Sequence, residues 1–145
     1  MGQIYLRALR EMWKYVLLWF PMVAIAVANG ALRQTWYGQH LSELRAHQIS
    51  TLTAVLAFSV YIWVVVRRWR PDSAAKAFAV GMLWLLMTVA FEFLFGRYVA
   101  GHTWERLLHD YDLLAGRVWI GVLIWVAVAP YLFFRLQTGA PVRRR

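Results

Sequence analysis

Four long apolar runs dominate this chain and limit what it can fold into. They occupy residues 15–32, 49–66, 77–95 and 118–134. Each run has roughly the ~17–25 residues that a helix needs to cross the ~30 Å hydrocarbon core of a membrane. We therefore predict an all-α polytopic membrane protein with four transmembrane helices.

Length and composition leave room for little else. The chain has 145 residues, of which 61% are apolar, whereas soluble domains usually contain about 45–50% apolar residues. The four runs account for about half of the chain, so the remainder forms short loops and tails. We expect one transmembrane domain over residues 1–145 and no separate soluble domain. The chain has no cysteine, which excludes a disulfide, a thiolate nucleophile and a cysteine-ligated metal.

The net charge of +9 is distributed unevenly between the two sides of such a bundle. One side carries eleven basic residues: Arg7, Arg10, Lys14, Arg67, Arg68, Arg70, Lys76, Arg135, Arg143, Arg144 and Arg145. The other side carries five: Arg33, Arg45, Arg97, Arg106 and Arg117. This asymmetry follows the positive-inside rule and predicts a membrane protein with both termini in the cytoplasm. The basic residues are expected to contact anionic lipid headgroups, not nucleic acid.

The sequence also contains an internal repeat. Shifting it by 62 residues, from His40 to His102, aligns VYIWVVV at 60–66 with VLIWVAV at 122–128, with five identities in seven positions. The repeat predicts two tandem helical hairpins, at approximately 8–70 and 71–134, followed by a basic tail at 135–145. Both hairpins start on the same side, so a rough two-fold axis along the membrane normal should relate them.

The simplest fold for such a chain is an up-down-up-down bundle of four antiparallel helices. The link between the hairpins, RRWRPDS, contains Pro71, which breaks the helix before it. Asp72 or Ser73 is expected to cap the third helix.

Two matching triads in the other loops are candidate metal ligands. Both follow the pattern H-x-x-E-x-x-x-H, and together they contain all four histidines of the chain. Their residues are His40, Glu43 and His47 in the first triad and His102, Glu105 and His109 in the second. On a helix, positions i, i+3 and i+7 share one face, so each triad would present its three side chains together. Under the two-fold relation the triads would face each other, and imidazoles with carboxylates suit zinc, copper or iron.

Other interpretations of the triads stay open. A haem held between His47 and His109 is a second possibility for a cofactor, because both histidines would lie at similar depth. The structural alternative is that these side chains are solvated, cap helices or pair with Arg45 and Arg106. The repeated pattern would then record only the duplication.

A second constellation is expected inside the bilayer. Glu92 lies within AFEFLFGR near the end of the third run, where an ionised carboxylate needs a partner or a cavity. We expect it to belong to a polar cluster at the periplasmic end, formed by Glu92, Arg117, Asn29, Arg33 and Asp112. Such a cluster can be a buried ion pair that fixes the helices or a site that handles protons or substrate.

Several segments resemble a known class of proteins. The stretches ANGALR, RAHQIST, FEFLFGRYVAG and DYDLLAGRVW resemble small four-helix bacterial inner-membrane proteins of unknown function. The resemblance covers most of the chain and implies the fold and the location, but no activity. Arg45, Ala46 and His47 are also similar to a motif of the microsomal glutathione-transferase superfamily, although Ile49 and Leu52 replace its Asn and Glu.

Three functions are compatible with these features. The favoured one is a non-catalytic accessory or partner-binding membrane subunit, because the chain lacks a constellation of nucleophile and base. The second is a small oligomeric transporter or channel that uses Glu92. The third is a membrane protein that binds a divalent metal or haem. The expected partners are the lipid bilayer and either a second copy of the chain or another membrane protein.

Overall fold

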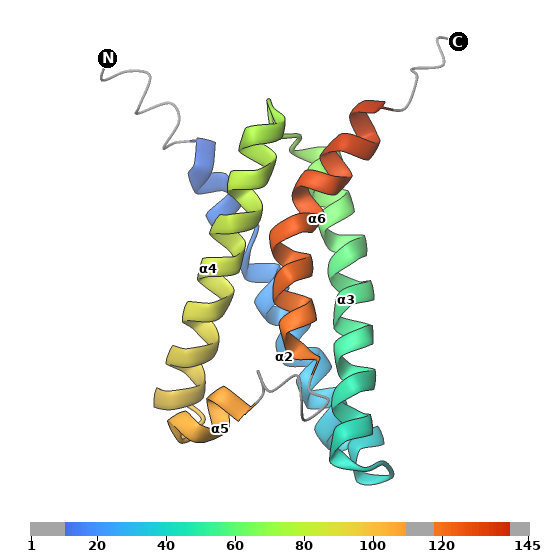
Figure 1. Cartoon of the computed structure of the whole chain (residues 1–145), viewed down its shortest axis with the longest axis vertical. Helices are drawn as coiled ribbons and strands as arrows, with labels where there is room; N and C mark the ends of the chain where they lie inside the picture. Colours follow the sequence, from blue (N-terminus) through green and yellow to red (C-terminus); the bar gives the residue numbers. More distant parts are fainter. Residues whose placement is uncertain (1–10, 110–117, 140–145) are drawn as a thin grey trace.

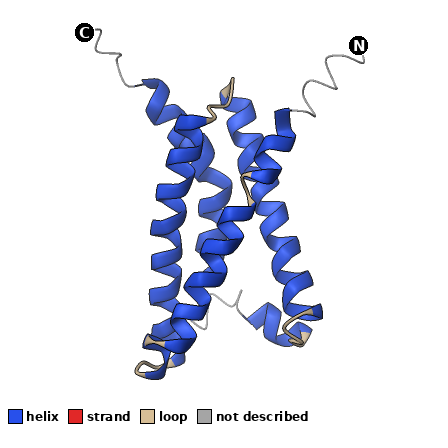
Figure 2. Ribbon diagram, turned by 180° about the vertical axis from the view of Figure 1, so that it is seen from behind, coloured by secondary structure: helices blue, strands red, loops and turns tan. Residues whose placement is uncertain are grey.

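The computed structural model describes residues 11–109 and 118–139, and it is helical throughout its long elements (Figures 1 and 2). Residues 11–17 are helical and lead into the labelled elements. These are α2 (Phe20–Thr35), the short 3₁₀ helix η1 (Tyr37–Gln39), α3 (Glu43–Arg68), α4 (Ala74–Tyr98), α5 (Trp104–His109) and α6 (Trp119–Gly139). The predicted all-α four-helix architecture is confirmed.

Four segments are long and apolar enough to cross a membrane. They are Glu11–Gln39, Glu43–Arg68, Ala74–Tyr98 and Trp119–Gly139. The protein is therefore a multi-pass membrane protein. Figure 1 places the start of the first segment, the α3–α4 link and the end of α6 at one end of the bundle, which we name the terminal end. The opposite end, with η1 and α5, is the loop end.

Side-chain caps fix where two of the long helices begin. Ser42 precedes α3 and its hydroxyl accepts a hydrogen bond from the backbone N–H of Arg45 at 3.4 Å. Ser73 precedes α4 and accepts from the N–H of Lys76 at 3.2 Å. Each cap satisfies one of the N–H groups that the first turn of a helix leaves without an intrahelical acceptor. Of the two caps predicted for the third span, Asp72 and Ser73, the structure uses Ser73.

The helices pack in the order α2, α3, α6, α4. α3 contacts both α2 and α6, and α6 contacts both α3 and α4, whereas α2 has little contact with α4. The buried core is made of apolar side chains from all four spans, including Met22, Phe58, Ile62, Trp84 and Val126. This order places one hairpin beside the other with α3 and α6 in the centre. A two-fold axis between α3 and α6 would produce the same order, and the duplication itself stays a prediction.

The backbones of α4 and α6 approach each other closely at Gly81. Gly81 of α4 is buried, and a Cβ atom placed on it would lie only 1.9 Å from the carbonyl oxygen of Ala127. Lipid provides no hydrophobic force to drive membrane helices together, so their association depends on close packing. Small residues allow the backbones to approach closely. Gly81 is therefore required for the α4–α6 contact.

Pro21 divides the first membrane segment into two parts. Proline has no N–H and clashes with the preceding turn, so the regular helix is interrupted at Leu18 and Trp19. The part before the break packs against α4, where Tyr15 and Trp19 are buried. After the break, α2 packs on α3 instead. The break thus separates α2 from α4 toward the loop end.

Two side chains satisfy backbone groups that the break releases from the helix. Trp19 N–H bonds to Val16 instead of Tyr15, and the indole Nε1–H of Trp84 donates to the freed Tyr15 carbonyl at 2.8 Å. Met22 N–H bonds to Trp19, and the hydroxyl of Tyr61 donates to the Leu18 carbonyl at 2.6 Å. Within a bilayer, such groups need an internal partner. The break in the first segment is therefore stabilised by side chains of α3 and α4.

An ion-pair cluster lies at the terminal end. The ammonium of Lys76 contacts the carboxylates of Glu11 and Asp72, the latter at 2.7 Å. Hydrogen bonding from Lys76, followed by its positive charge, lowers the pKa of the Asp72 carboxyl below its ordinary value. This cluster connects the start of the first segment to the start of α4.

Candidate functional site

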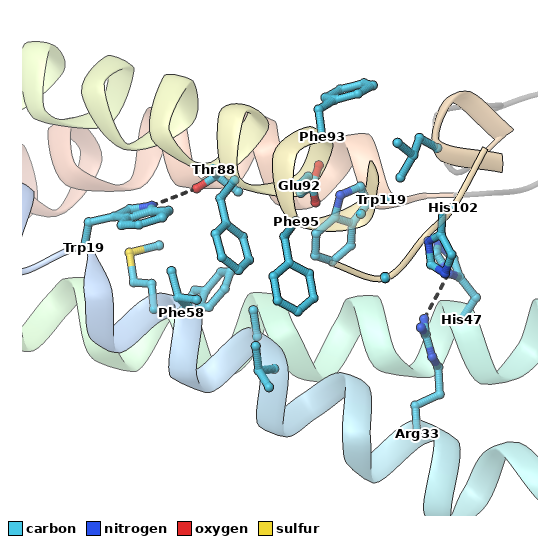
Figure 3. Close-up of a pocket in the computed structure, with 18 of the residues that line it drawn as sticks. Trp19, Arg33, His47, Phe58, Thr88, Glu92, Phe93, Phe95, His102 and Trp119 are labelled. Atoms are coloured by element: carbon cyan, nitrogen blue, oxygen red, sulfur yellow. Dashed lines mark hydrogen bonds between the residues drawn. The ribbon is translucent and has the colours of Figure 1, made fainter. Parts of the chain in front are cut away.

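A crevice of about 380 Å³ lies where α2 and α4 separate (Figure 3). Its volume falls within the ~300–1,000 Å³ typical of small-molecule sites. Side chains of α2, α3 and α4 form most of its walls, and the loop before α5, α5 itself and the start of α6 complete it. The lining residues are Trp19, Met22, Val23, Ala26, Val27, Arg33, Gln34, His47, Phe58, Thr88, Phe91, Glu92, Phe93, Phe95, Gly96, Ala100, His102, Leu107 and Trp119.

Aromatic rings form part of the wall of the crevice. Phe91 and Phe95, one turn apart on α4, stack with ring centroids 5.2 Å apart. Trp19 meets Phe91 edge to face at 5.9 Å. The indole Nε1–H of Trp19 donates to the hydroxyl of Thr88 at 3.0 Å, and this bond closes the crevice toward the terminal end. The remaining walls are largely apolar, so the body of the crevice suits a lipophilic molecule.

The crevice is as deep as one leaflet of a bilayer. Along α2 its lining extends from Met22 to Arg33, which at 1.5 Å per residue is roughly 17 Å. Half of a ~30 Å hydrocarbon core is about 15 Å. The length of the crevice therefore matches the thickness of one leaflet.

The mouth of the crevice is polar. Arg33 of α2 approaches His47 of α3, with 3.3 Å between Nη1 of the arginine and Nδ1 of the histidine (Figure 3). Arginine nitrogens only donate hydrogen bonds, so Nδ1 of His47 is the accepting atom of this contact. His47 is only 6% exposed, although it belongs to the first turns of α3. The pair thus places a guanidinium against a buried imidazole at the loop end of the bundle.

The mouth continues into a second cavity, a polar vestibule of about 400 Å³ at the loop end. Its lining residues are Arg33, Gln34, Gly38, Gln39, Glu43, Ala46, His47, His102 and Arg106. Four of these, Arg33, Gln34, His47 and His102, also line the crevice. The two cavities are therefore neighbours that share a polar wall, beside the largely apolar body of the crevice.

Glu92 lies in the α4 wall of the crevice and is half-buried. It follows Thr88 by four residues, which puts both on one side of α4, and both line the crevice. Arg33 and His47 line the same crevice. A carboxylate at this depth can accept a hydrogen bond or hold a proton.

Of the predicted polar cluster, the structure describes Glu92, Arg33 and Asn29. Glu92 and Arg33 line one crevice, as described above. Asn29 instead connects α2 to α3: its amide donates to the carbonyl and hydroxyl of Ser50 at 2.8 and 2.9 Å, and its oxygen accepts from Thr53. Asp112 and Arg117 lie outside the described residues.

The two histidine triads do not each line one helical face. α3 begins at Glu43 after the Ser42 cap, so His40 precedes the helix. Likewise, Thr103 caps α5 by accepting from the N–H of Arg106, and His102 precedes it. The prediction that each triad lies along one continuous helix is therefore wrong, because a capping residue inside each pattern begins a new helix.

The six triad residues also differ in their surroundings. His47 is buried and His102 half-buried, and both line the crevice, whereas His40, Glu43, Glu105 and His109 are exposed. No group of three metal-ligating side chains comes together among residues 11–109 and 118–139. His109 lines neither cavity, so the structure does not unite it with His47 around a haem. The donor set expected for a metal or haem is not assembled in the described part of the chain.

The aromatic wall of this site was not predicted from the sequence. Thr88, Phe91 and Phe95 recur at i, i+3 and i+7, a spacing that puts them on one face of α4. The signal was present, but in an apolar membrane helix it does not differ from ordinary packing.

Comparisons with known proteins do not extend this description. No protein-family model, no curated protein and no solved structure matches the chain.

Proposed function

We propose that this protein is a small, non-catalytic accessory protein of the bacterial inner membrane that binds a lipophilic molecule in the crevice between α2 and α4. In this proposal both termini are cytoplasmic and the mouth of the crevice faces the periplasm. The eleven-to-five distribution of basic residues supports the orientation.

One observation carries the proposal: the separation of α2 and α4 is fixed by the fold. Pro21 redirects α2, and Trp84 and Tyr61 hold the redirected backbone through hydrogen bonds to freed carbonyls. The Trp19–Thr88 bond and the stacked rings of the wall then define a preformed cavity. Preformed, mostly apolar cavities with a few polar groups are typical of ligand sites.

A pair of matched variants tests this function. Ala26 lines the crevice, whereas Ala28, two residues further along α2, is exposed and does not line it. Ala26→Trp should fill the crevice, and Ala28→Trp should leave it open. Native mass spectrometry of the purified proteins would count the phospholipid molecules that each retains in detergent. We expect Ala26→Trp to lose a bound lipid that the wild type and Ala28→Trp retain. Equal lipid retention by all three would refute the proposed site.

Glu92 favours a second candidate function, a carrier that moves its ligand across the membrane. A carboxylate in the crevice wall can exchange a proton during such a cycle. The test is movement of a fluorescent phospholipid between the leaflets of reconstituted vesicles. A carrier requires that Glu92→Gln abolishes the movement and preserves binding. If the wild-type protein produces no movement, binding is its only role.

A further inference from the structure

We infer that the occupant of the crevice is an anionic phospholipid, with one acyl chain between α2 and α4 and its phosphate at the mouth. This inference deepens the proposed function and rests on it. It assigns a headgroup subsite to Arg33 and Arg106, with the imidazoles of His47 and His102 beside them.

The charges of the site favour an anion at its opening. The vestibule contains two arginines, Arg33 and Arg106, and one carboxylate, Glu43. Arg33 is held by its contact with the buried ring of His47, so part of the entropy cost of ordering its side chain is already met. Arginine matches the geometry of phosphate, because its planar fork can donate two parallel hydrogen bonds.

The placement of these groups identifies the anion as a lipid headgroup. Arg33 lies at the interface end of a cavity about one leaflet deep. Phe91, Phe95 and Val23 line the cavity beneath it. A free phosphate would use only the vestibule and leave the apolar body unfilled. A phospholipid of the adjacent leaflet occupies both parts while its second chain stays in the bilayer.

The test compares two lipids that differ only in the headgroup. Full-length protein is stripped of lipid in detergent and titrated with dioleoyl phosphatidylglycerol or dioleoyl phosphatidylcholine, and binding is followed by native mass spectrometry. We expect phosphatidylglycerol to bind more tightly. Arg33→Gln and Arg106→Gln should each weaken it about fivefold, the factor that corresponds to ~1 kcal/mol per basic residue at a membrane surface. Arg45→Gln is the control, since Arg45 is exposed near the same end but lines neither cavity.

The results separate this inference from the proposed function. If both lipids bind equally and neither arginine variant differs from Arg45→Gln, the headgroup subsite is refuted. The crevice proposal would still stand if Ala26→Trp blocks binding. Displacement of phosphatidylglycerol by millimolar inorganic phosphate or glycerol phosphate would mean that the vestibule recognises free phosphate, and this would overturn the assignment to a lipid. A preference for phosphatidylcholine would also overturn it. If neither lipid binds the wild type, both proposals fail.

Discussion

Replacement of Gly81 by alanine should force α4 and α6 apart. The added Cβ atom would lie 1.9 Å from the carbonyl oxygen of Ala127 and 2.8 Å from its carbonyl carbon. Real Cβ atoms essentially never approach another atom closer than 3.0 Å, so the backbones must separate by at least 1.1 Å. A gap of about 0.5–1 Å already removes roughly a quarter to a half of the dispersion energy of a contact. We therefore expect a loss of ~1–3 kcal/mol, the usual cost of overpacking.

Gly121→Ala is the matched control for this prediction. Gly121 belongs to α6 and is exposed, and a Cβ atom on it would meet nothing within 4 Å. Alanine favours the helix over glycine by up to ~1 kcal/mol, so this variant should be neutral or slightly more stable. Free energies of unfolding would be measured by steric trapping in bilayers. A Gly81→Ala protein as stable as Gly121→Ala would refute the close packing of α4 and α6.

Three further predictions concern polar contacts elsewhere in the bundle. Tyr61→Phe should cost ~1–3 kcal/mol of unfolding free energy, because the Leu18 carbonyl loses its partner; a loss no larger than that of the exposed Tyr98→Phe would contradict this. Asn29→Leu should cost ~1–2 kcal/mol, since interhelical hydrogen bonds in membranes average ~0.6 kcal/mol each; steric trapping would measure the loss. Asp72 has a lowered pKa in the folded state, so its stabilising contribution is present above 3.8 and disappears as the pH falls below that value. Asp72→Asn should remove this dependence, and an unchanged profile of stability against pH would count against the ion pair.

The sequence predicted the four spans because each apolar run is long enough to cross a bilayer. The sequence limited the cap of the third span to Asp72 or Ser73, because both residue types favour that position, and the structure uses Ser73. The break at Leu18 and Trp19 was missed, because the run at 15–32 continues through Pro21 without a polar interruption. Without the break, nothing in the sequence indicated that α2 leaves α4, so the crevice could not be predicted.

The sequence indicated the depth of some polar residues but not which side chains they meet. Glu92 and Arg33 were expected near one another in depth, and they share the crevice. The triads were interpreted as continuous helices, although Ser42 and Thr103 within them begin new helices and leave His40 and His102 outside. Whether side chains from different helices meet depends on how the helices cross, and spacing along one helix does not specify that.

The central claim, that the crevice holds one lipid chain, can be tested by photocrosslinking. A phosphatidylglycerol with a diazirine on one acyl chain is added at one equivalent to the protein in detergent, which dilutes nonspecific surface contacts. After irradiation, mass spectrometry locates the adducts. We predict that they concentrate on the crevice side chains Val23, Ala26 and Phe91, and that Ala26→Trp abolishes them. Adducts spread evenly over outward residues such as Val60 and Leu86, which are 68% and 65% exposed, would contradict the claim.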